Sequence, residues 1–136
     1  MRIGSRGTRA FTLIELMIVV VIIGILASIA IPHYASVKER AYLTTVKTDL
    51  KNLDISEEAY ASANSGQYFS HDYSTTADST NTFGVSQGVT LSATAAGQTG
   101  WSAVATHSLV PGHTCAIFVG TAPVAPAVFE GAPACD

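Results

Sequence analysis

One carboxylate in this sequence lies where a charge is costly. Glu15 is the single charged side chain in the apolar run Phe11–Ile31, which reads FTLIELMIVVVIIGILASIAI. An acidic side chain at the centre of a membrane-spanning helix costs about 2.5–3.5 kcal/mol on insertion scales. Because the sequence keeps this carboxylate near the head of the run, we expect it to have a partner.

The other reactive side chains do not form a catalytic motif. His107 and Ser108 are adjacent, but the sequence has no Gly-x-Ser-x-Gly elbow, no His-Glu-x-x-His and no phosphate-binding glycine loop. It also has no Cys-x-x-Cys, and His107, His113 and Cys115 lack a fourth ligand for a metal site. We therefore expect neither an enzyme nor a bound cofactor or metal.

The apolar run is the element that must position Glu15. At about 1.5 Å per helical residue, Phe11–Ile31 would be about 31 Å long, which matches a hydrocarbon core of about 30 Å. Arg2, Arg6 and Arg9 precede it without any acidic residue. The positive-inside rule therefore predicts a cytoplasmic N-terminus, with everything after the run outside.

The start of the run resembles a known processing signal. The residues AFTLIELM, from Ala10 to Met17, are similar to the class III signal of type IV pilins and type II secretion pseudopilins. In that family a membrane peptidase cuts before the Phe on the cytoplasmic side and N-methylates the new terminus. The resemblance implies a leader of residues 1–10, a cut between Ala10 and Phe11, and methylation of Phe11. Ala10 replaces the Gly that is usual in the family, and this would slow the cut.

Two other interpretations of the same stretch remain. Ser28-Ile29-Ala30 fits the small-x-small cleavage site of an ordinary secretory signal, although the apolar part of such a signal is only about 7–15 residues long. Hydropathy alone is also compatible with an uncleaved membrane anchor, in which Glu15 reaches the interface from one turn inside the membrane. The second interpretation predicts a membrane-tethered binding domain.

Two residues weaken the predicted helix. Pro32 lacks a backbone N–H and crowds the carbonyl four residues back, so we expect a kink near residues 27–32. Gly24 costs about 1 kcal/mol of helix propensity relative to Ala. The family resemblance implies that this stretch loosens when subunits pack into a filament, whereas the residues alone are equally consistent with a static kink.

An amphipathic pattern continues the helix over residues 34–64. Its apolar positions recur at helical spacing, and Gly66 supplies a left-handed cap. One helix over residues 11–64 would be about 80 Å long, too long to be buried by the residues after it. Its hydrophobic half should therefore protrude, and the resemblance implies that it packs against the same half of neighbouring subunits. The predicted apolar positions are Leu43, Val46, Leu50, Leu53 and Tyr60.

The rest of the chain predicts a small antiparallel sheet, and hence an α+β fold. Residues 67–81 are rich in Ser, Thr and Asp and indicate an exposed loop. Three strands follow over residues 85–95, 100–109 and 113–120, separated by glycines at turn-like positions, and short connections favour a meander. The Pro- and Ala-rich end is unsuited to a central strand. The predicted inward residues are Val89, Leu91, Trp101, Ile117 and Phe118.

Cys115 and Cys135 lie in the part predicted to be outside the membrane, where an oxidising environment favours their pairing. A disulfide closing a loop of about 20 residues contributes roughly 3 kcal/mol in the chain-entropy model. It would attach the Pro-rich tail to the strand containing Cys115. Many type IV pilins have a disulfide-bounded region of this kind, and the resemblance implies the same here.

The charge balance argues against nucleic-acid binding. The formal net charge is −3, and the leader holds three of the seven Lys and Arg residues but none of the ten Asp and Glu residues. The chain after the leader is therefore still more acidic, whereas nonspecific nucleic-acid binding depends on clustered Lys and Arg. The basic leader is a topology signal, and we expect no nucleic-acid partner.

The sequence as a whole predicts a filament subunit with four segments: a leader (1–10), an assembly helix (11–31), an amphipathic half (32–66) and a head (67–136). The preferred interpretation is a major type IV pilin for adhesion or twitching motility, and the alternative is a pseudopilin of a type II secretion system. The expected partners are further copies of the chain, the prepilin peptidase and N-methyltransferase, and the assembly platform. We expect an inner-membrane precursor and then an extracellular pilus or a periplasmic pseudopilus. The predicted assembly residues are Phe11, Glu15, Gly24 and Pro32.

Overall fold

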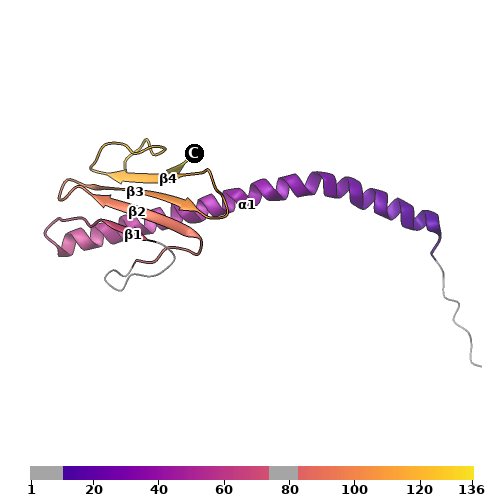
Figure 1. The fold of residues 1–136 in the computed structure, drawn as a ribbon, viewed down its shortest axis with the longest axis horizontal. Helices are drawn as coiled ribbons and strands as arrows, with labels where there is room; N and C mark the ends of the chain where they lie inside the picture. The colour runs from indigo at the N-terminus through magenta and orange to yellow at the C-terminus, as the bar shows by residue number, and fades with distance from the viewer. Residues whose placement is uncertain (1–10, 74–82) are drawn as a thin grey trace, which may run out of the picture. The chain divides into compact units, whose positions relative to one another are not determined.

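A single long helix precedes a five-stranded sheet. The structure is a computed structural model that describes residues 11–73 and 83–136 (Figure 1). The α+β class predicted from the sequence, with a long N-terminal helix and a small antiparallel sheet, is confirmed. The elements are α1 (Leu13–Ala63), β1 (His71–Tyr73), β2 (Val89–Ala95), β3 (Trp101–His107), β4 (Cys115–Val119) and β5 (Ala134–Cys135).

The chain divides into two units within α1. One unit ends at Val37, and the other, which we call the head, begins at Lys38 and runs to Asp136. In the first unit the described side chains are exposed, apart from that of Ala27, which is half-buried. The hydrophobic core of the described residues therefore lies entirely in the head.

The strands of the head form an antiparallel meander. Their order in the sheet is β1-β2-β3-β4-β5, and each strand pairs with the next along the chain. In the register, Leu91 lies opposite Ala105, and Ala103 lies opposite Ile117. The predicted meander is confirmed, because short connections join strands that are neighbours both in sequence and in the sheet.

The core forms between one face of the sheet and the C-terminal half of α1 (Figure 1). Along β2 and β3, buried and exposed residues alternate, as expected when one face of a sheet is covered. On the helix, the buried residues recur at steps of three and four, so they form one stripe. The completely buried apolar side chains include those of Val46, Leu50, Leu53, Val89, Leu91, Trp101 and Ile117.

Two residues predicted for this core lie elsewhere. Phe118 is buried on the other side of the sheet, against Ala127, because neighbouring residues in a strand face opposite sides and Ile117 faces the helix. Tyr60 is 37% exposed, and its ring packs edge-on against Phe69. Ala61 occupies the buried position on the helical stripe instead.

The sheet has two short strands that the sequence did not predict. β1 lies in the segment predicted to be a loop, where Asp72 accepts a hydrogen bond from the Ser92 hydroxyl of β2. β5 pairs with the other edge of the sheet. Residues 74–81 of the predicted loop lie outside the described residues. Both strands are too short for an alternating apolar pattern, and for this reason periodicity did not predict them.

The helix ends close to the predicted position. α1 ends at Ala63, and Gly66 has a φ of 80°, in the left-handed region that favours glycine. The Gly66 N–H donates to the carbonyl oxygen of Ala61 at 2.8 Å, which closes the last turn. At positions 24 and 32, the helix continues through both the glycine and the proline.

Candidate assembly site on the N-terminal helix

The carboxylate of Glu15 is bound at the first turn of α1. The helix begins at Leu13, so Thr12 is the N-cap residue. The Thr12 backbone N–H and the Thr12 hydroxyl both donate to Glu15 Oε2, each at 2.8 Å. In return, the Glu15 backbone N–H donates to Thr12 Oγ1 at 3.3 Å. This reciprocal pair is a capping box, which satisfies N–H groups left free at a helix start.

Thr12 is therefore a residue of the site that the sequence analysis missed. The signal was present, because a Thr followed by a Glu three positions later is the sequence pattern of a capping box. Within the described part of one chain, Thr12 is the residue that binds the Glu15 carboxylate. One oxygen of the carboxylate, Oε1, has no hydrogen bond described in the structure, so the group retains an acceptor for a second partner.

Apolar side chains surround the helix after Glu15. The large apolar residues from Phe11 to Ile31 are between 47% and 82% exposed, with no side of the helix covered. By length and composition, α1 is the one helix in the described part of the chain that is suited to cross a membrane. A helix that is apolar on all sides is unfavourable in water, so this surface requires a lipid or protein environment.

The remaining predicted assembly residues lie along the same helix. Phe11 precedes the helix and is 82% exposed, while Ala10 lies outside the described residues. A Cβ atom added at Gly24 would meet nothing within 4 Å, so the single chain gives no steric reason for a glycine there. Pro32 lies inside α1. The structure brings Glu15 together only with Thr12, and the other predicted residues make no shared site within one chain.

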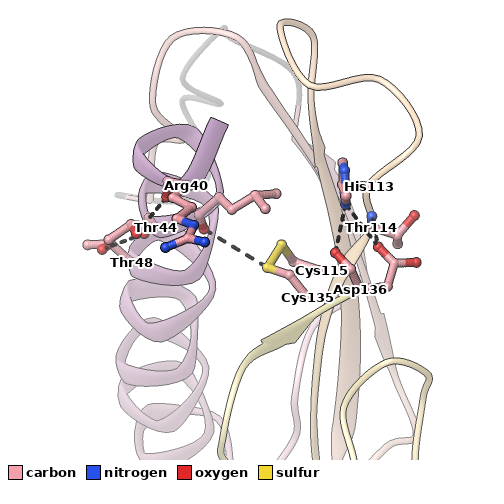
Figure 2. The surroundings of a disulfide bond; sticks show 9 residues. Arg40, Thr44, Thr48, His113, Thr114, Cys115, Cys135 and Asp136 are labelled. Atoms are coloured by element: carbon pink, nitrogen blue, oxygen red, sulfur yellow. Dashed lines mark hydrogen bonds and ion pairs between the residues drawn. A yellow bond between two sulfur atoms is a disulfide. The ribbon is translucent and has the colours of Figure 1, made fainter. Parts of the chain in front are cut away.

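The predicted cysteine pair lies in the head. Cys115 of β4 and Cys135 of β5 form a disulfide bond, and the two residues lie opposite each other in the sheet register (Figure 2). Cys135 Sγ lies 4.0 Å from the carbonyl oxygen of Leu43 on α1. A disulfide sulfur carries no proton to donate, so we interpret this approach as packing. The bond thus fixes the C-terminal segment both to the sheet and beside the helix.

Next to the disulfide, His113 connects the helix to the last residue of the sheet region. Its Nε2 lies 3.1 Å from Oε1 of Glu39 on α1, and its Nδ1 lies 2.7 Å from the backbone oxygen of Asp136. Oδ1 of Asp136 accepts the backbone N–H of Thr114 at 2.7 Å (Figure 2). These contacts account for His113 as a structural residue. The described residues contain no group of three or more His, Cys, Asp or Glu side chains suited to hold a metal ion.

One acidic side chain is completely buried in the head. Glu57 lies on the buried stripe of α1, where its Oε2 accepts the backbone N–H of Phe69 at 3.2 Å. Its Oε1 has no hydrogen-bond partner among the described residues. Burial raises the pKa of Glu57 to about 7, an effect that the charge of Glu58 reinforces and the Phe69 N–H opposes. Glu57 is not among the apolar positions that the sequence predicted for this stripe.

Comparison with known families assigns the N-terminal segment. The model of the prokaryotic N-terminal methylation motif matches residues 5–31. This range contains the predicted cut between Ala10 and Phe11, the capped Glu15 and the exposed apolar surface that follows. From Phe11 onward, the matched segment is therefore the one whose large apolar side chains are left exposed by the described residues.

Curated relatives fall into two groups. The chain is 52% identical over 54 residues to the type IV major pilin protein PilA of Myxococcus xanthus, which covers 40% of this chain and 24% of that protein. It is 46% identical over 54 residues to a fimbrial protein of Pseudomonas aeruginosa, covering 40% and 35%. It is also 42% identical over 55 residues to the type II secretion system core protein G of Pseudomonas aeruginosa, covering 40% and 39%.

These similarities are limited in extent. The matched part spans less than half the length of each of these curated relatives. No solved structure matches the chain. The chain carries the prokaryotic N-terminal methylation motif and is a relative of type IV pilins and of type II secretion core protein G, which confirms the resemblance predicted from the residues AFTLIELM.

Proposed function

We propose that this chain is the structural subunit of a type IV pilus, used for adhesion or twitching motility. In this proposal the precursor is held in the inner membrane with its N-terminus in the cytoplasm. The prepilin peptidase cuts between Ala10 and Phe11 and methylates Phe11. The assembly platform then moves the subunit from the membrane into a filament of identical copies, where its helix is surrounded by the helices of its neighbours.

The observation that carries this proposal is the exposed apolar surface from Phe11 to Ile31 with its single carboxylate at Glu15. A lipid bilayer satisfies this surface before assembly, and the same surface of other copies satisfies it afterwards. The open space around Gly24 supports close approach of a neighbouring helix, because small residues allow helix backbones to pack tightly.

The proposed role of Glu15 is to neutralise the N-terminal amine of a neighbouring subunit. Cutting before Phe11 creates an amine whose reference pKa is about 7.7–8.0, so it is mostly cationic near neutral pH. A carboxylate and a cation inside an apolar filament core are each costly alone and compensate each other when paired. The free oxygen of Glu15 supports this role, since the Thr12 contacts occupy only Oε2.

A pseudopilin of a type II secretion system is the second candidate. Its specific support is the similarity to core protein G of several bacteria, at 38% to 42% identity. Such a subunit would form a short periplasmic filament from the same helix. An uncleaved, membrane-tethered binding domain is the third candidate, and it requires that the leader remain attached.

The first experiment is the mass of the N-terminal peptide from protein purified out of native membranes or sheared fibres. A peptide that begins at methylated Phe11 supports the filament candidates. A peptide that begins at Ile31 indicates ordinary secretion, and an intact Met1 or Arg2 indicates a tethered domain or a failed cut at Ala10. The variant Ala10→Gly distinguishes the last two, because it restores the usual family residue before the cut.

Sheared fibres made mainly of this chain favour the pilin, while loss of secretion without fibres favours the pseudopilin.

Variants of the capping box separate the two roles of Glu15. Glu15→Gln removes the charge and retains a side-chain oxygen for capping, whereas Thr12→Val removes the capping hydroxyl and retains the charge. If Glu15 pairs with an amine, Glu15→Gln is cut normally but its assembly is strongly impaired, and Thr12→Val still assembles. Normal assembly of Glu15→Gln and Glu15→Ala would refute the pairing.

A further inference from the structure

The exposed side of α1 in the head carries charges in an ordered row. Arg40, Lys47 and Lys51 are exposed and follow one another at steps of seven and four residues, which places them on one face of the helix. Asp54 and Glu58 continue this face at steps of three and four residues. We call these five residues the charge stripe. It lies beside the buried stripe of α1 and is separate from the apolar surface described above.

The charge stripe is basic at one end and acidic at the other. Its three cations come first along the helix, and its two carboxylates follow. The sequence contains no Lys or Arg after Lys51. From Lys47 to Glu58 a helix rises about 17 Å, and from Arg40 to Glu58 about 27 Å. The two ends are therefore too far apart to neutralise each other within one helix.

The middle of the charge stripe is already paired within the chain. Lys51 Nζ lies 2.8 Å from Asp54 Oδ2, and it also donates to the carbonyl oxygen of Gly131 at 3.0 Å. This ion pair joins neighbouring turns of α1, while the second contact fixes the C-terminal loop of the head to the helix. Lys51 is therefore occupied by contacts within the head.

The two ends of the charge stripe are not paired in this way. Arg40 and Lys47 form no ion pair within residues 11–73 and 83–136, and neither does Glu58. Glu58 Oε1 accepts the hydroxyl of Tyr68 at 3.1 Å. Exposed cations at one end and an exposed carboxylate at the other make the surface complementary to a shifted copy of itself.

We propose that the charge stripe binds a second copy of this chain, parallel to the first and shifted by about 17 Å, with Lys47 of one copy opposite Glu58 of the next. In this arrangement, Arg40 of the first copy lies opposite Lys51 of the second, whose charge is already paired with Asp54, and within one turn of Asp54 itself. This inference rests on the proposed function, because copies whose N-terminal helices share one membrane or filament core are parallel. Unshifted parallel copies would place like charges opposite each other, which is unfavourable.

A lipid surface does not explain the basic end of the stripe. The apolar run ends at Ile31, and Lys47 is about 24 Å further along a helix. The polar layer of a bilayer adds only about 5–8 Å on each side of the hydrocarbon core. Lipid phosphates therefore do not reach Lys47, whereas a neighbouring subunit does.

The charge stripe sets the shift between neighbours more than the strength of the filament. Exposed ion pairs contribute little individually and are screened over about 8 Å at physiological ionic strength. Charge patterns of this kind exclude incorrect alignments, because a wrong shift places like charges together. The apolar helices provide the attraction, and the stripe selects one alignment among many that are similarly apolar.

Reversing charges in the full-length chain tests this contact, with the amount of sheared filament per cell as the measurement. The test variants are Lys47→Glu, Glu58→Lys and the double exchange Lys47→Glu/Glu58→Lys. The matched control is Lys38→Glu, which makes the same charge change on the opposite side of the same helix, where Lys38 Nζ lies 5.9 Å from the centre of the Tyr42 ring. All three positions are exposed, so the head should fold in each variant.

We expect Lys47→Glu and Glu58→Lys each to reduce filament by about fivefold or more, and the double exchange to restore it to within about twofold. Lys38→Glu should remain within about twofold of the wild type. Failure of the double exchange to restore filament would overturn the contact, and so would an equal loss in Lys38→Glu. A loss in Lys47→Glu with normal filament in Glu58→Lys would indicate a different partner and also overturn it. If the wild-type chain formed no filament, the proposed function itself would fail, which is a separate result.

Discussion

The two units of this chain share one helix, but its large apolar side chains are exposed in the first unit, whereas one stripe of them is buried in the head. In the first unit, Ile22 and Ile25 are 51% and 58% exposed. In the head, Leu50 and Leu53 of the same helix are completely buried against the sheet. The described residues of the head therefore bury their own core, while the apolar side chains of the first unit require a lipid or protein environment.

This difference also bears on which part of the sequence is similar to that of the relatives. The family model matches residues 5–31, where, in the proposed function, the apolar surface must suit a membrane, a peptidase and neighbouring helices together. The head must bury its own core, which many sequences can achieve. This agrees with similarity to pilins and to secretion core proteins that spans less than half of each relative.

Separating the units should have the largest effect. Residues 38–136 alone should fold and remain in the aqueous phase of a detergent partition, because the core lies within the head. Residues 11–136 should enter the detergent phase because of the apolar surface. Circular dichroism checks that the isolated head is folded. If the head required detergent to stay in solution, the division would be wrong.

Matched truncations should affect stability in one unit only. Leu50→Ala should lower the free energy of unfolding of the head by about 2–5 kcal/mol, because it opens a cavity in the core. Ile22→Ala removes a similar side chain from the exposed surface and should leave that free energy unchanged. Denaturant unfolding in detergent, followed by Trp101 fluorescence, measures both. Equal losses would show that the first unit contributes to the folding of the head.

Removing the disulfide should weaken the head by about 3 kcal/mol, since the bond closes a segment of 20 residues. The double variant Cys115→Ala/Cys135→Ala is suited to this test because it leaves no single reactive thiol. Its helix in the first unit should insert into membranes as before. Unfolding of the variant and the wild type under the same conditions gives the difference, and an unchanged midpoint would contradict the expected contribution.

The smallest effect concerns Glu57 and pH. Its pKa is about 7 in the head against an ordinary value of 4.5, so between these values the folded state binds more protons than the unfolded state. The stability of the head should therefore fall as pH rises from about 4.5 to 7 and level off above that. Glu57→Gln should remove this slope and stabilise the head at pH 8 by about 1–3 kcal/mol.

The exposed neighbour Glu58 provides the control for this measurement. Glu58→Gln changes the formal charge equally at a position that is not buried. Because burial is the main cause of the raised pKa of Glu57 and the charge of Glu58 only reinforces it, the slope should become smaller but remain. Denaturant unfolding at several pH values compares the two variants. If Glu57→Gln kept the same slope as the wild type, another group would be responsible for it.

Much of the fold could be predicted from periodicity. Repeated steps of three and four residues identified the core side of the helix at Val46, Leu50 and Leu53, and turn residues separated the three main strands. Periodicity and residue type disagreed at Glu57. It lies four positions after Leu53 and hence on the buried stripe, but it was left out of the predicted core because its side chain is charged. Position on the helix was the better guide to burial. The carboxyl group stays in the core, and its burial raises its pKa.

Other features depend on contacts that leave little trace in the sequence. The short strand β1 is fixed by pairing with β2, and its residues have no alternating pattern of their own. The face occupied by Phe118 depends on the segment around Ala127, which covers the other side of β4. At the candidate site, by contrast, the signal around Glu15 was local. The capping role of Thr12 could have been predicted from the same few residues.

The disulfide between Cys115 and Cys135 has a consequence for the segment that it encloses. Gly131 N–H donates to the Phe118 carbonyl oxygen at 2.9 Å, and the Glu130 carboxylate accepts the Gly120 N–H at 2.6 Å, so the end of the loop is bound to the sheet. Val128 and Phe129, just before it, are 71% and 76% exposed. A protease that cut between these two residues would leave both fragments joined by the disulfide. Because both side chains are exposed and the end of the loop stays bound to the sheet, an epitope tag inserted there would be displayed without releasing the end of the chain.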